Sequence, residues 1–243
     1  MNLKVVKHGE NPSLILGSGM KMKFYDLSTS TLKWKHEDGS ITDVDFYETV
    51  KTFAEIWGVG IITALPEEGS VKIISSVKIT SIFGKLPFKI AEVDGDFIAN
   101  GIGLTSFENF PKKVTGKVEI MRNRIGGSLI YEGTFGGSFL CGGNKSLYSL
   151  EFKNQKVING DLEIGNCSFG ILPVGLERIE GNLDATNNQL STGKASFYVA
   201  GNADLGNNKI VSEDDMLKVG GTVYLSENPV QPDDNLKETA TWS

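Results

Sequence analysis

A glycine that recurs at nearly constant spacing constrains this chain of 243 residues more than any other feature of its sequence. The successive spacings are 21, 21, 23, 21, 20 and 20 residues. The glycines concerned are Gly95, Gly116, Gly137, Gly160, Gly181, Gly201 and Gly221. Self-similarity at a period of this length is typical of solenoids and related repeat architectures, in which each repeat packs only on its neighbours.

Apolar residues occupy fixed positions around each of these glycines. With the glycine as position 0, positions −2, +2 and +4 are apolar in every unit, and position +9 is apolar in all units except the one that holds Ser146. The spacing of two is typical of a short strand with one face buried. The remaining dozen or so residues are too few for two turns and a full helix. With a fainter unit at Gly69, the pattern predicts about eight β-coils with loops on the outer side.

Asparagine stands at position +7 in most units. The residues in this column are Ile102, Asn123, Asn144, Cys167, Asn188, Asn208 and Asn228. An asparagine amide at a tight corner can bond backbone groups of the neighbouring coil, and stacking then aligns these bonds into a ladder. Cys167 fits the column as a small buried donor. The pattern predicts that Asn188 and Asn208 stabilise the fold, and that the outward Asn182 and Asn202 behave as ordinary surface residues.

The order apolar-x-Gly-x-apolar-x-apolar-x-x-Asn-x-apolar resembles the leucine-rich repeat from its second leucine to its last. The resemblance covers residues 69–230 and departs in the first half, where the glycine is fixed. It implies a mainly β fold, a short-period leucine-rich-repeat-like β-solenoid over residues 67–230. A small α+β cap is expected over residues 1–66 and a C-terminal tail over residues 231–243. Short units of this kind also resemble repeat proteins of bacteriophages and other large viruses.

The N-terminal segment does not follow the period, and its residues predict strands and one helix. Strands are expected at Leu3–Val6, Ser13–Leu16, Lys21–Leu27 and Thr31–Lys35. A helix is predicted to begin at Asp45 with Glu48 as its capping-box partner, and to end at Gly58. The segment is either a cap on the first coil or an adaptor that joins the chain to another protein. Trp242 either folds back over Val223 and Leu225 or docks on a neighbouring subunit.

Composition and motifs argue against several classes of function. A net charge of −6 disfavours non-specific binding of nucleic acids. No apolar run approaches the roughly 20 residues that span a bilayer, and the N-terminus lacks the apolar stretch of a signal peptide. His8 and His36 have no partner at a recognisable spacing and no Cys-x-x-Cys occurs, so no catalytic residue, metal site or cofactor is predicted. Cys141 and Cys167 are expected to be free, slowly reacting thiols.

One group of polar residues remains, on the outward positions +1 and +3 of the strands. These positions hold six carboxylates and one lysine. The +3 row reads Ile98, Glu119, Leu140, Glu163, Asp184, Asp204 and Tyr224, and the +1 row reads Asp96, Lys117, Ser138, Asp161, Asn182, Asn202 and Thr222. Coils stack about 4.8 Å apart, so these carboxylates form a ladder. The row is either a solvated surface that prevents aggregation, a docking site for a basic protein, or a weak calcium site, although the calcium β-roll motif is absent.

The expected function is therefore structural or protein-binding and non-enzymatic. The viral resemblance implies a virion component, such as a tail, baseplate or head accessory protein, whose partners are other proteins and neither nucleic acid nor membrane. A free cytoplasmic module that captures a host protein is the alternative, and an enzyme with a site on the strand face is the third. The expected partner-binding residues are Glu119, Leu140, Glu163, Asp184, Asp204, Tyr224 and Trp242.

Overall fold

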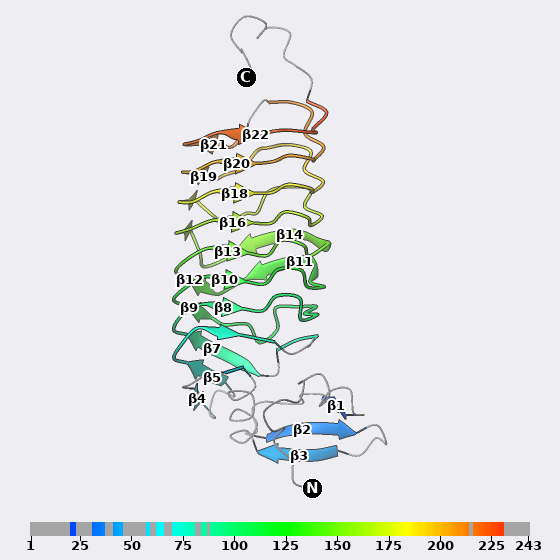
Figure 1. Ribbon diagram of the computed structural model, residues 1–243, viewed down its shortest axis with the longest axis vertical. Coiled ribbons are helices and arrows are strands. Elements are labelled where there is room, and N and C mark those ends of the chain that lie inside the picture. The colour runs from blue at the N-terminus through cyan, green and yellow to red at the C-terminus, as the bar shows by residue number, and fades with distance from the viewer. Residues whose placement is uncertain are drawn as a thin grey trace, which may run out of the picture. The chain divides into compact units, whose positions relative to one another are not determined.

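The computed structural model describes residues 20–22, 31–36, 41–45, 57–58, 62–65, 70–80, 84–86, 88–213 and 216–230. The chain divides into two compact units, which we call unit 1 (residues 1–125 and 133–137) and unit 2 (residues 126–132 and 138–243). The described residues contain no helix, and both units consist of stacked coils joined by parallel strands (Figure 1). The predicted mainly β solenoid is confirmed, but it has about seven turns and not the about eight coils expected from the sequence.

Unit 1 builds its coils from two parallel sheets. The first contains β5 (Ser70–Ile73), β7 (Lys89–Val93), β9 (Lys113–Val114) and β12 (Thr134–Phe135), and β4 (Ile62–Leu65) joins its edge antiparallel to β5. The second contains β6 (Val77–Lys78), β8 (Phe97–Ile98) and β10 (Val118–Glu119). A separate antiparallel sheet joins β1 (Met20–Met22), β2 (Thr31–His36) and β3 (Ile41–Asp45).

Unit 2 repeats this arrangement. One row of strands comprises β13 (Phe139–Leu140), β16 (Leu162–Glu163), β18 (Leu183–Asp184), β20 (Ala203–Asp204) and β22 (Val223–Tyr224). A second comprises β15 (Val157–Ile158), β17 (Arg178–Ile179), β19 (Tyr198–Val199) and β21 (Lys218–Val219). A longer parallel pair is formed by β11 (Gly126–Tyr131) and β14 (Ser146–Phe152). Equivalent positions pair directly, as Leu162 does with Leu183.

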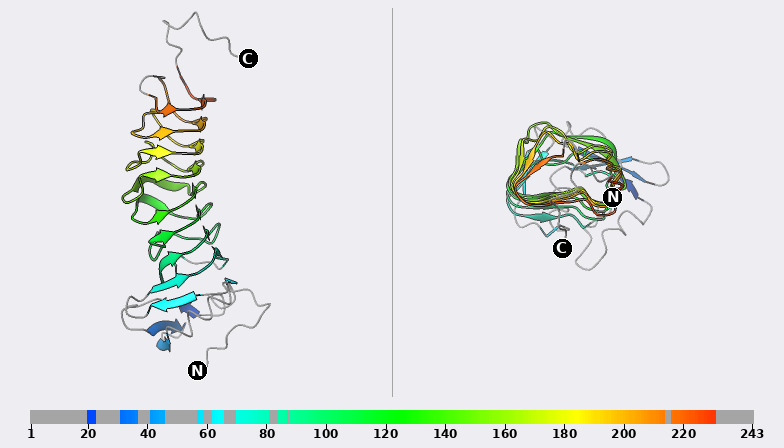
Figure 2. Two further views of the ribbon diagram at one scale, coloured as in Figure 1. Left: turned by 90° about the vertical axis from the view of Figure 1, so that its left-hand side faces the viewer. Right: turned by 90° about the horizontal axis from the view of Figure 1, so that it is seen from above.

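The glycine column turns each coil through a corner. The sequence pattern indicated one strand across the glycine, but two short strands of different sheets flank it, as β17 and β18 flank Gly181. The N–H of Gly181 donates to the carbonyl of Gly160 at 3.0 Å, and that of Gly201 donates to Gly181 at 3.0 Å. A Cβ added to Gly181 would lie 2.3 Å from Asp161 Oδ1. Only glycine lets the corners of successive coils approach this closely, which explains its fixed position. Within each unit the coils stack one above another (Figure 2).

The predicted asparagine ladder is confirmed. Asn188 Oδ1 accepts from the N–H of Phe169 at 3.0 Å, and its amide donates to the carbonyl of Ile164 in the preceding coil at 3.0 Å. Asn208 makes the equivalent bonds to Leu190 and Ala185. Asn123, Asn144, Asn188 and Asn208 are all buried. Cys167 takes the same place, because its thiol lies 3.7 Å from the carbonyl of Cys141 in the preceding coil.

A column of left-handed residues directly precedes this ladder and was not anticipated from the sequence. Its members, with φ between 53° and 77°, are Gly101, Arg122, Gly143, Asn166, Asn187, Asn207 and Glu227. Glycine and asparagine tolerate this conformation best, and five of the seven positions hold one of them. The dipeptides Asn187-Asn188 and Asn207-Asn208 were the sequence signal for the corner.

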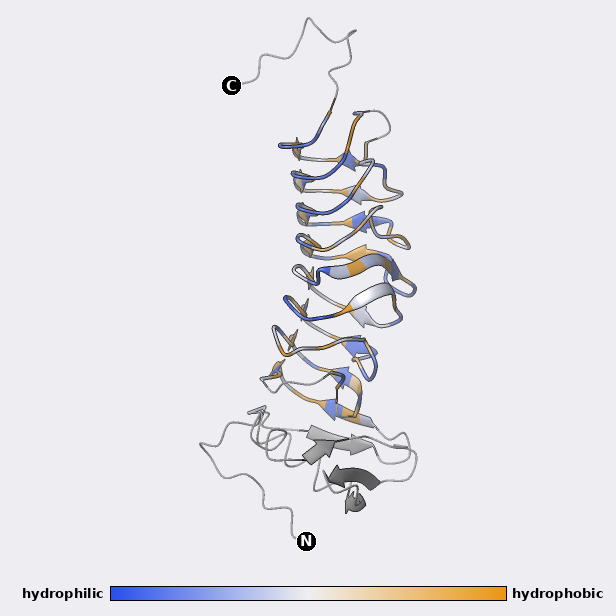
Figure 3. Cartoon of the chain, turned by 90° about the vertical axis from the view of Figure 1, so that its right-hand side faces the viewer, coloured by the Kyte–Doolittle hydropathy of each residue, from blue (hydrophilic) through white to orange (hydrophobic). Residues whose placement is uncertain are grey.

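Apolar residues recur along every coil (Figure 3). Most of their side chains at the repeated inward positions are buried. In unit 2, Phe139 and Phe152 contact each other edge to face, with ring centroids 5.1 Å apart. Phe139, Phe152 and Phe169 are each no more than 1% exposed. In unit 1, Trp57 is 6% exposed and its ring centroid lies 5.5 Å from that of Phe88.

The N-terminal predictions are tested only in part. The strand expected at Thr31–Lys35 is confirmed as β2. Of the strand expected at Lys21–Leu27, residues 21–22 lie in β1, and residues 23–27 lie outside the described residues. The strands expected at Leu3–Val6 and Ser13–Leu16 lie outside the described residues, as do residues 46–56 of the expected helix. Asp45 ends β3, and Gly58 has the left-handed φ of 64° that a helix-terminating glycine would need.

We expect Asn188→Ala to lower the free energy of unfolding by about 1–3 kcal/mol, because it leaves buried backbone groups of two coils unpaired. Gln189→Ala is the matched control. Gln189 is exposed, and only its backbone N–H has a hydrogen bond among the described residues. Its replacement should change the free energy by no more than about 0.5 kcal/mol. Urea unfolding followed by circular dichroism measures both, and equal losses would contradict the ladder.

We expect Arg122→Gly to raise the free energy of unfolding by about 0.5–1 kcal/mol, because glycine relieves the left-handed strain of a side chain with φ of 54°. Arg124 is exposed and lies outside the left-handed column. Arg124→Gly should lower the free energy of unfolding by a similar amount, because glycine increases the conformational entropy of the unfolded chain. Thermal unfolding of the two variants tests the opposite signs. A loss of stability in both would show that the corner does not strain Arg122.

Candidate functional site

Five of the predicted partner-binding residues lie in one row on unit 2, which we call the strand-face row: Leu140, Glu163, Asp184, Asp204 and Tyr224. Each pairs with the next across the parallel sheet. Tyr224 is 48% exposed, and the others are half-buried. Glu119 takes the corresponding place on β10 of unit 1. Trp242 lies outside the described residues.

Hydrogen bonds at the strand ends fix the two aspartates of the row. Asp184 Oδ1 accepts from the N–H of Thr186 at 2.9 Å and from its hydroxyl at 2.8 Å. Asp204 Oδ1 accepts from the N–H of Gly206 at 3.0 Å. These are the local turns that aspartate side chains favour. None of the described residues donates a hydrogen bond to Oδ2 of either aspartate. The turns therefore use only Oδ1 of each carboxylate.

Glycines beneath the carboxylates make room for them. A Cβ added to Gly165 would lie 2.9 Å from Asp184 Oδ1, and one added to Gly142 would lie 3.0 Å from Glu163 Oε1. Each carboxylate therefore lies over the backbone of the preceding coil near the corner. Glycine at position +5 in Gly142 and Gly165 was the sequence signal for this arrangement at Glu163 and Asp184, whereas Asp204 has Thr186 at that position of the preceding coil.

The +1 row forms a second ladder, which corrects the expectation for Asn182 and Asn202. In unit 2 each side-chain oxygen accepts the backbone N–H of the next residue in the row: Ser138 from Asp161 at 2.9 Å, Asp161 from Asn182 at 2.7 Å, Asn182 from Asn202 at 2.9 Å and Asn202 from Thr222 at 2.8 Å. Asn182 and Asn202 are exposed, but each holds a neighbouring coil. Side-chain alternation shows which residues face outward and says nothing of bonds along the stack, so the prediction missed them.

The part of the strand face in unit 1 differs electrostatically from that in unit 2. Lys117 Nζ lies 2.7 Å from Glu119 Oε2, and the amide of Asn100 donates to Glu119 Oε1. The hydrogen bond from Lys117 lowers the pKa of Glu119 and keeps it ionised. This ion pair neutralises the charge of Glu119.

Both cysteines are free and buried, as predicted. Burial raises the pKa of the Cys141 thiol well above its ordinary value and raises that of Cys167 to about 11. The thiolate is the nucleophilic form, so neither side chain is a competent nucleophile near neutral pH. Among the described residues, no group of three or more histidine, cysteine, aspartate and glutamate side chains could hold a metal ion. The described part of the chain also has no helix long and apolar enough to span a bilayer.

The sequence did not predict four exposed apolar side chains on the long pair β11–β14 and in the residues that follow it. They are Ile130, Tyr148, Ile171 and Val174, each between 42% and 55% exposed. Ile130 pairs with Glu151, which in turn bridges to Val174, so two of these residues flank a carboxylate on successive coils. The repeat predicts only the residues at fixed positions around each glycine, and these four residues do not occupy such positions.

Comparison of the chain with protein families, with curated proteins and with solved structures found no match. The resemblances to leucine-rich repeats and to viral repeat proteins therefore rest on the repeat pattern alone.

We expect the protein to lose stability as the pH rises from about 9 to about 11. The thiols of the unfolded chain ionise near pH 9, whereas burial keeps Cys167 protonated in the folded protein until about pH 11. Between these pH values ionisation therefore lowers the free energy of the unfolded state relative to the folded state. Each such thiol contributes a slope of about 1.4 kcal/mol per pH unit in this range and nothing below it. Urea unfolding at a series of pH values, compared with the Cys141→Ala/Cys167→Ala variant, measures the slope. Identical slopes in the two proteins would contradict the burial of the thiols.

Proposed function

We propose that this chain is a non-enzymatic interaction protein of a virion, and that its strand-face row docks a basic surface of another protein in the assembly. The observation that carries the proposal is the alignment of Glu163, Asp184 and Asp204 on successive coils, with Leu140 and Tyr224 at the two ends. Four intervals of about 4.8 Å give a row of about 19 Å. A line of lysine or arginine side chains with an apolar residue at each end would match it.

Fixed carboxylates favour such docking. The turns at Asp184 and Asp204 hold these side chains in place before a partner arrives, so little rotamer entropy is lost on binding. The oxygens that the turns leave unused are available to cationic groups. Charges on a protein surface also increase the rate of association and make it sensitive to salt, because attraction is screened beyond roughly 8 Å at physiological ionic strength.

The virion assignment rests on the resemblance of the repeat to viral repeat proteins, and a free cytoplasmic module that captures a host protein is the second candidate. Both use the same surface. Mass spectrometry of purified particles from infected cells separates them, since a virion component co-purifies at constant stoichiometry. Its recovery only from the particle-free supernatant would favour the cytoplasmic module.

We expect the triple variant Glu163→Gln/Asp184→Asn/Asp204→Asn to bind a lysine-rich octapeptide at least about tenfold more weakly than the natural protein. The amides keep the turn acceptors of Asp184 and Asp204 and remove only the charge, so the fold should persist. Fluorescence anisotropy at low and high salt measures the affinity, and circular dichroism checks folding.

The matched control for this test is the variant Glu151→Gln/Glu177→Gln/Glu213→Gln, which removes three exposed carboxylates of unit 2 outside the row. It changes the net charge by the same amount and should bind within about twofold of the natural protein. Equal weakening by both variants would show that the peptide responds to net charge, and that the strand-face row is only a solvated surface.

A further inference from the structure

Unit 2 carries a second row of outward side chains, on the sheet that meets the sheet of the strand-face row at the glycine corner. Strands β15, β17, β19 and β21 pair in parallel (Figure 1). Their outward positions hold four residues that we call the basic row: Val157, Arg178, Tyr198 and Lys218. Lys218 is exposed and the other three are half-buried. Both rows repeat once per coil, so they share a spacing of about 4.8 Å.

Two neighbours hold the cation of Arg178 in place. Its Nε donates to Glu180 Oε1 at 2.6 Å, and its guanidinium carbon lies 4.7 Å from the centre of the Tyr198 ring in the next coil. A guanidinium has five N–H donors in a planar fork, and the bond to Glu180 uses one of them. Arg178 is therefore fixed before a partner arrives, as Asp184 and Asp204 are in the strand-face row.

The two rows match each other when two parallel copies of the chain lie side by side with a shift of one coil. The four residues of the basic row then face, in order, the first four residues of the strand-face row of the neighbouring copy. Arg178 faces Glu163 and Lys218 faces Asp204, so each cation meets a carboxylate. Without the shift, Val157 would face Glu163, and an apolar side chain would desolvate a carboxylate.

The other two pairs of this register are complementary as well. Tyr198 faces Asp184, whose turn uses only Oδ1, and the phenol hydroxyl can donate to the second oxygen. Val157 faces Leu140, and both are half-buried apolar side chains at the same end of their rows. All four positions therefore agree in their chemistry.

We propose that the basic surface bound by the strand-face row is the basic row of a second copy of this chain. The inference rests on the proposed function, which takes the strand-face row as the docking surface. A second copy has the required spacing because its rows repeat with the same coils, whereas a protein of another fold would have to reproduce it. The two rows are different surfaces, so each copy binds one neighbour through each row. A contact of this kind with a shift along the stack cannot close into a ring, and it builds an open filament.

The test exchanges the charges of one proposed contact in the full chain. We expect Lys218→Asp and Asp204→Lys each to weaken self-association at least about tenfold, because each places like charges opposite each other. An equimolar mixture of the two variants should associate within about threefold of the natural protein, since the altered residues then form an ion pair. Light scattering over a concentration series measures the association, which should weaken as the salt concentration rises.

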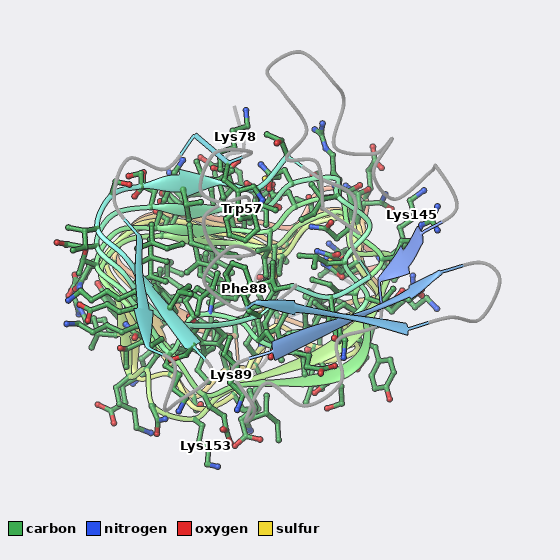
Figure 4. The ribbon with its side chains drawn as sticks, turned by 90° about the horizontal axis from the view of Figure 1, so that it is seen from below. Trp57, Lys78, Phe88, Lys89, Lys145 and Lys153 are labelled. Atoms are coloured by element: carbon green, nitrogen blue, oxygen red, sulfur yellow. The ribbon has the colours of Figure 1, made fainter. Side chains whose placement is uncertain are left out.

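The matched control is Lys145→Asp, which changes the net charge by the same amount as Lys218→Asp. Lys145 is exposed beside β14, outside both rows, and projects outward from the coils (Figure 4). Its replacement should leave the association within about twofold of the natural protein. Asp204→Lys also removes the acceptor for the N–H of Gly206, so Asp204→Asn, which keeps an acceptor, should weaken the association as well. Circular dichroism checks that each variant is folded.

A mixture that associates when neither variant does so alone supports the proposal. A natural protein that stays monomeric at low salt would overturn it, as would a mixture that stays dissociated or an association that Lys218→Asp leaves unchanged. A failure here is distinct from a failure of the proposed function. A monomeric protein whose strand-face row still binds the lysine-rich octapeptide has a different basic partner, whereas octapeptide binding that does not depend on the row removes the docking surface itself.

Discussion

The close approach of successive backbones at the glycine corner is the constraint on which the rest of this structure depends. Glycine lies above glycine, with N–H to carbonyl distances of 2.9–3.0 Å in both units. A side chain at the corner would collide with the coil beneath, since a Cβ on Gly201 would lie 2.5 Å from Asn182 Oδ1. Because the corners must coincide, insertions between them are confined to the loops, and the spacing stays between 20 and 23 residues.

The polar ladders follow from the same stacking. A coil this short turns sharply, and each turn removes backbone groups from water. The asparagines at position +7 satisfy those groups on the inside, and the short side chains at position +1 do so on the outside. Cys167 can take the place of asparagine in this column because its thiol makes a weaker bond to the same carbonyl position that asparagine amides use in neighbouring coils.

The repeat in the sequence predicted the buried columns, the asparagine ladder and the absence of helices from the coils, because each depends on which side chains face inward. It did not predict the division of each strand into two at the glycine, the left-handed residues such as Arg122, or the bonds of Asn182 and Asn202. Those features depend on the direction of the backbone and on contacts along the stack. The alternation of apolar residues contains no information on the backbone direction or on contacts along the stack. Only the dipeptides Asn187-Asn188 and Asn207-Asn208 indicated the corner.

The same reasoning separates structural from functional demand in the strand-face row. The turns at Asp184 and Asp204 require an acceptor at Oδ1, and asparagine would meet that requirement without charge, as Asn182 does for the N–H of Asn202 in the adjacent row. Three carboxylates on successive coils repel one another, so their charge lowers the stability of the fold. The turns themselves do not require that charge. Hydrogen bonding thus explains an oxygen at these positions but not its negative charge. The cationic partner proposed above would account for that charge.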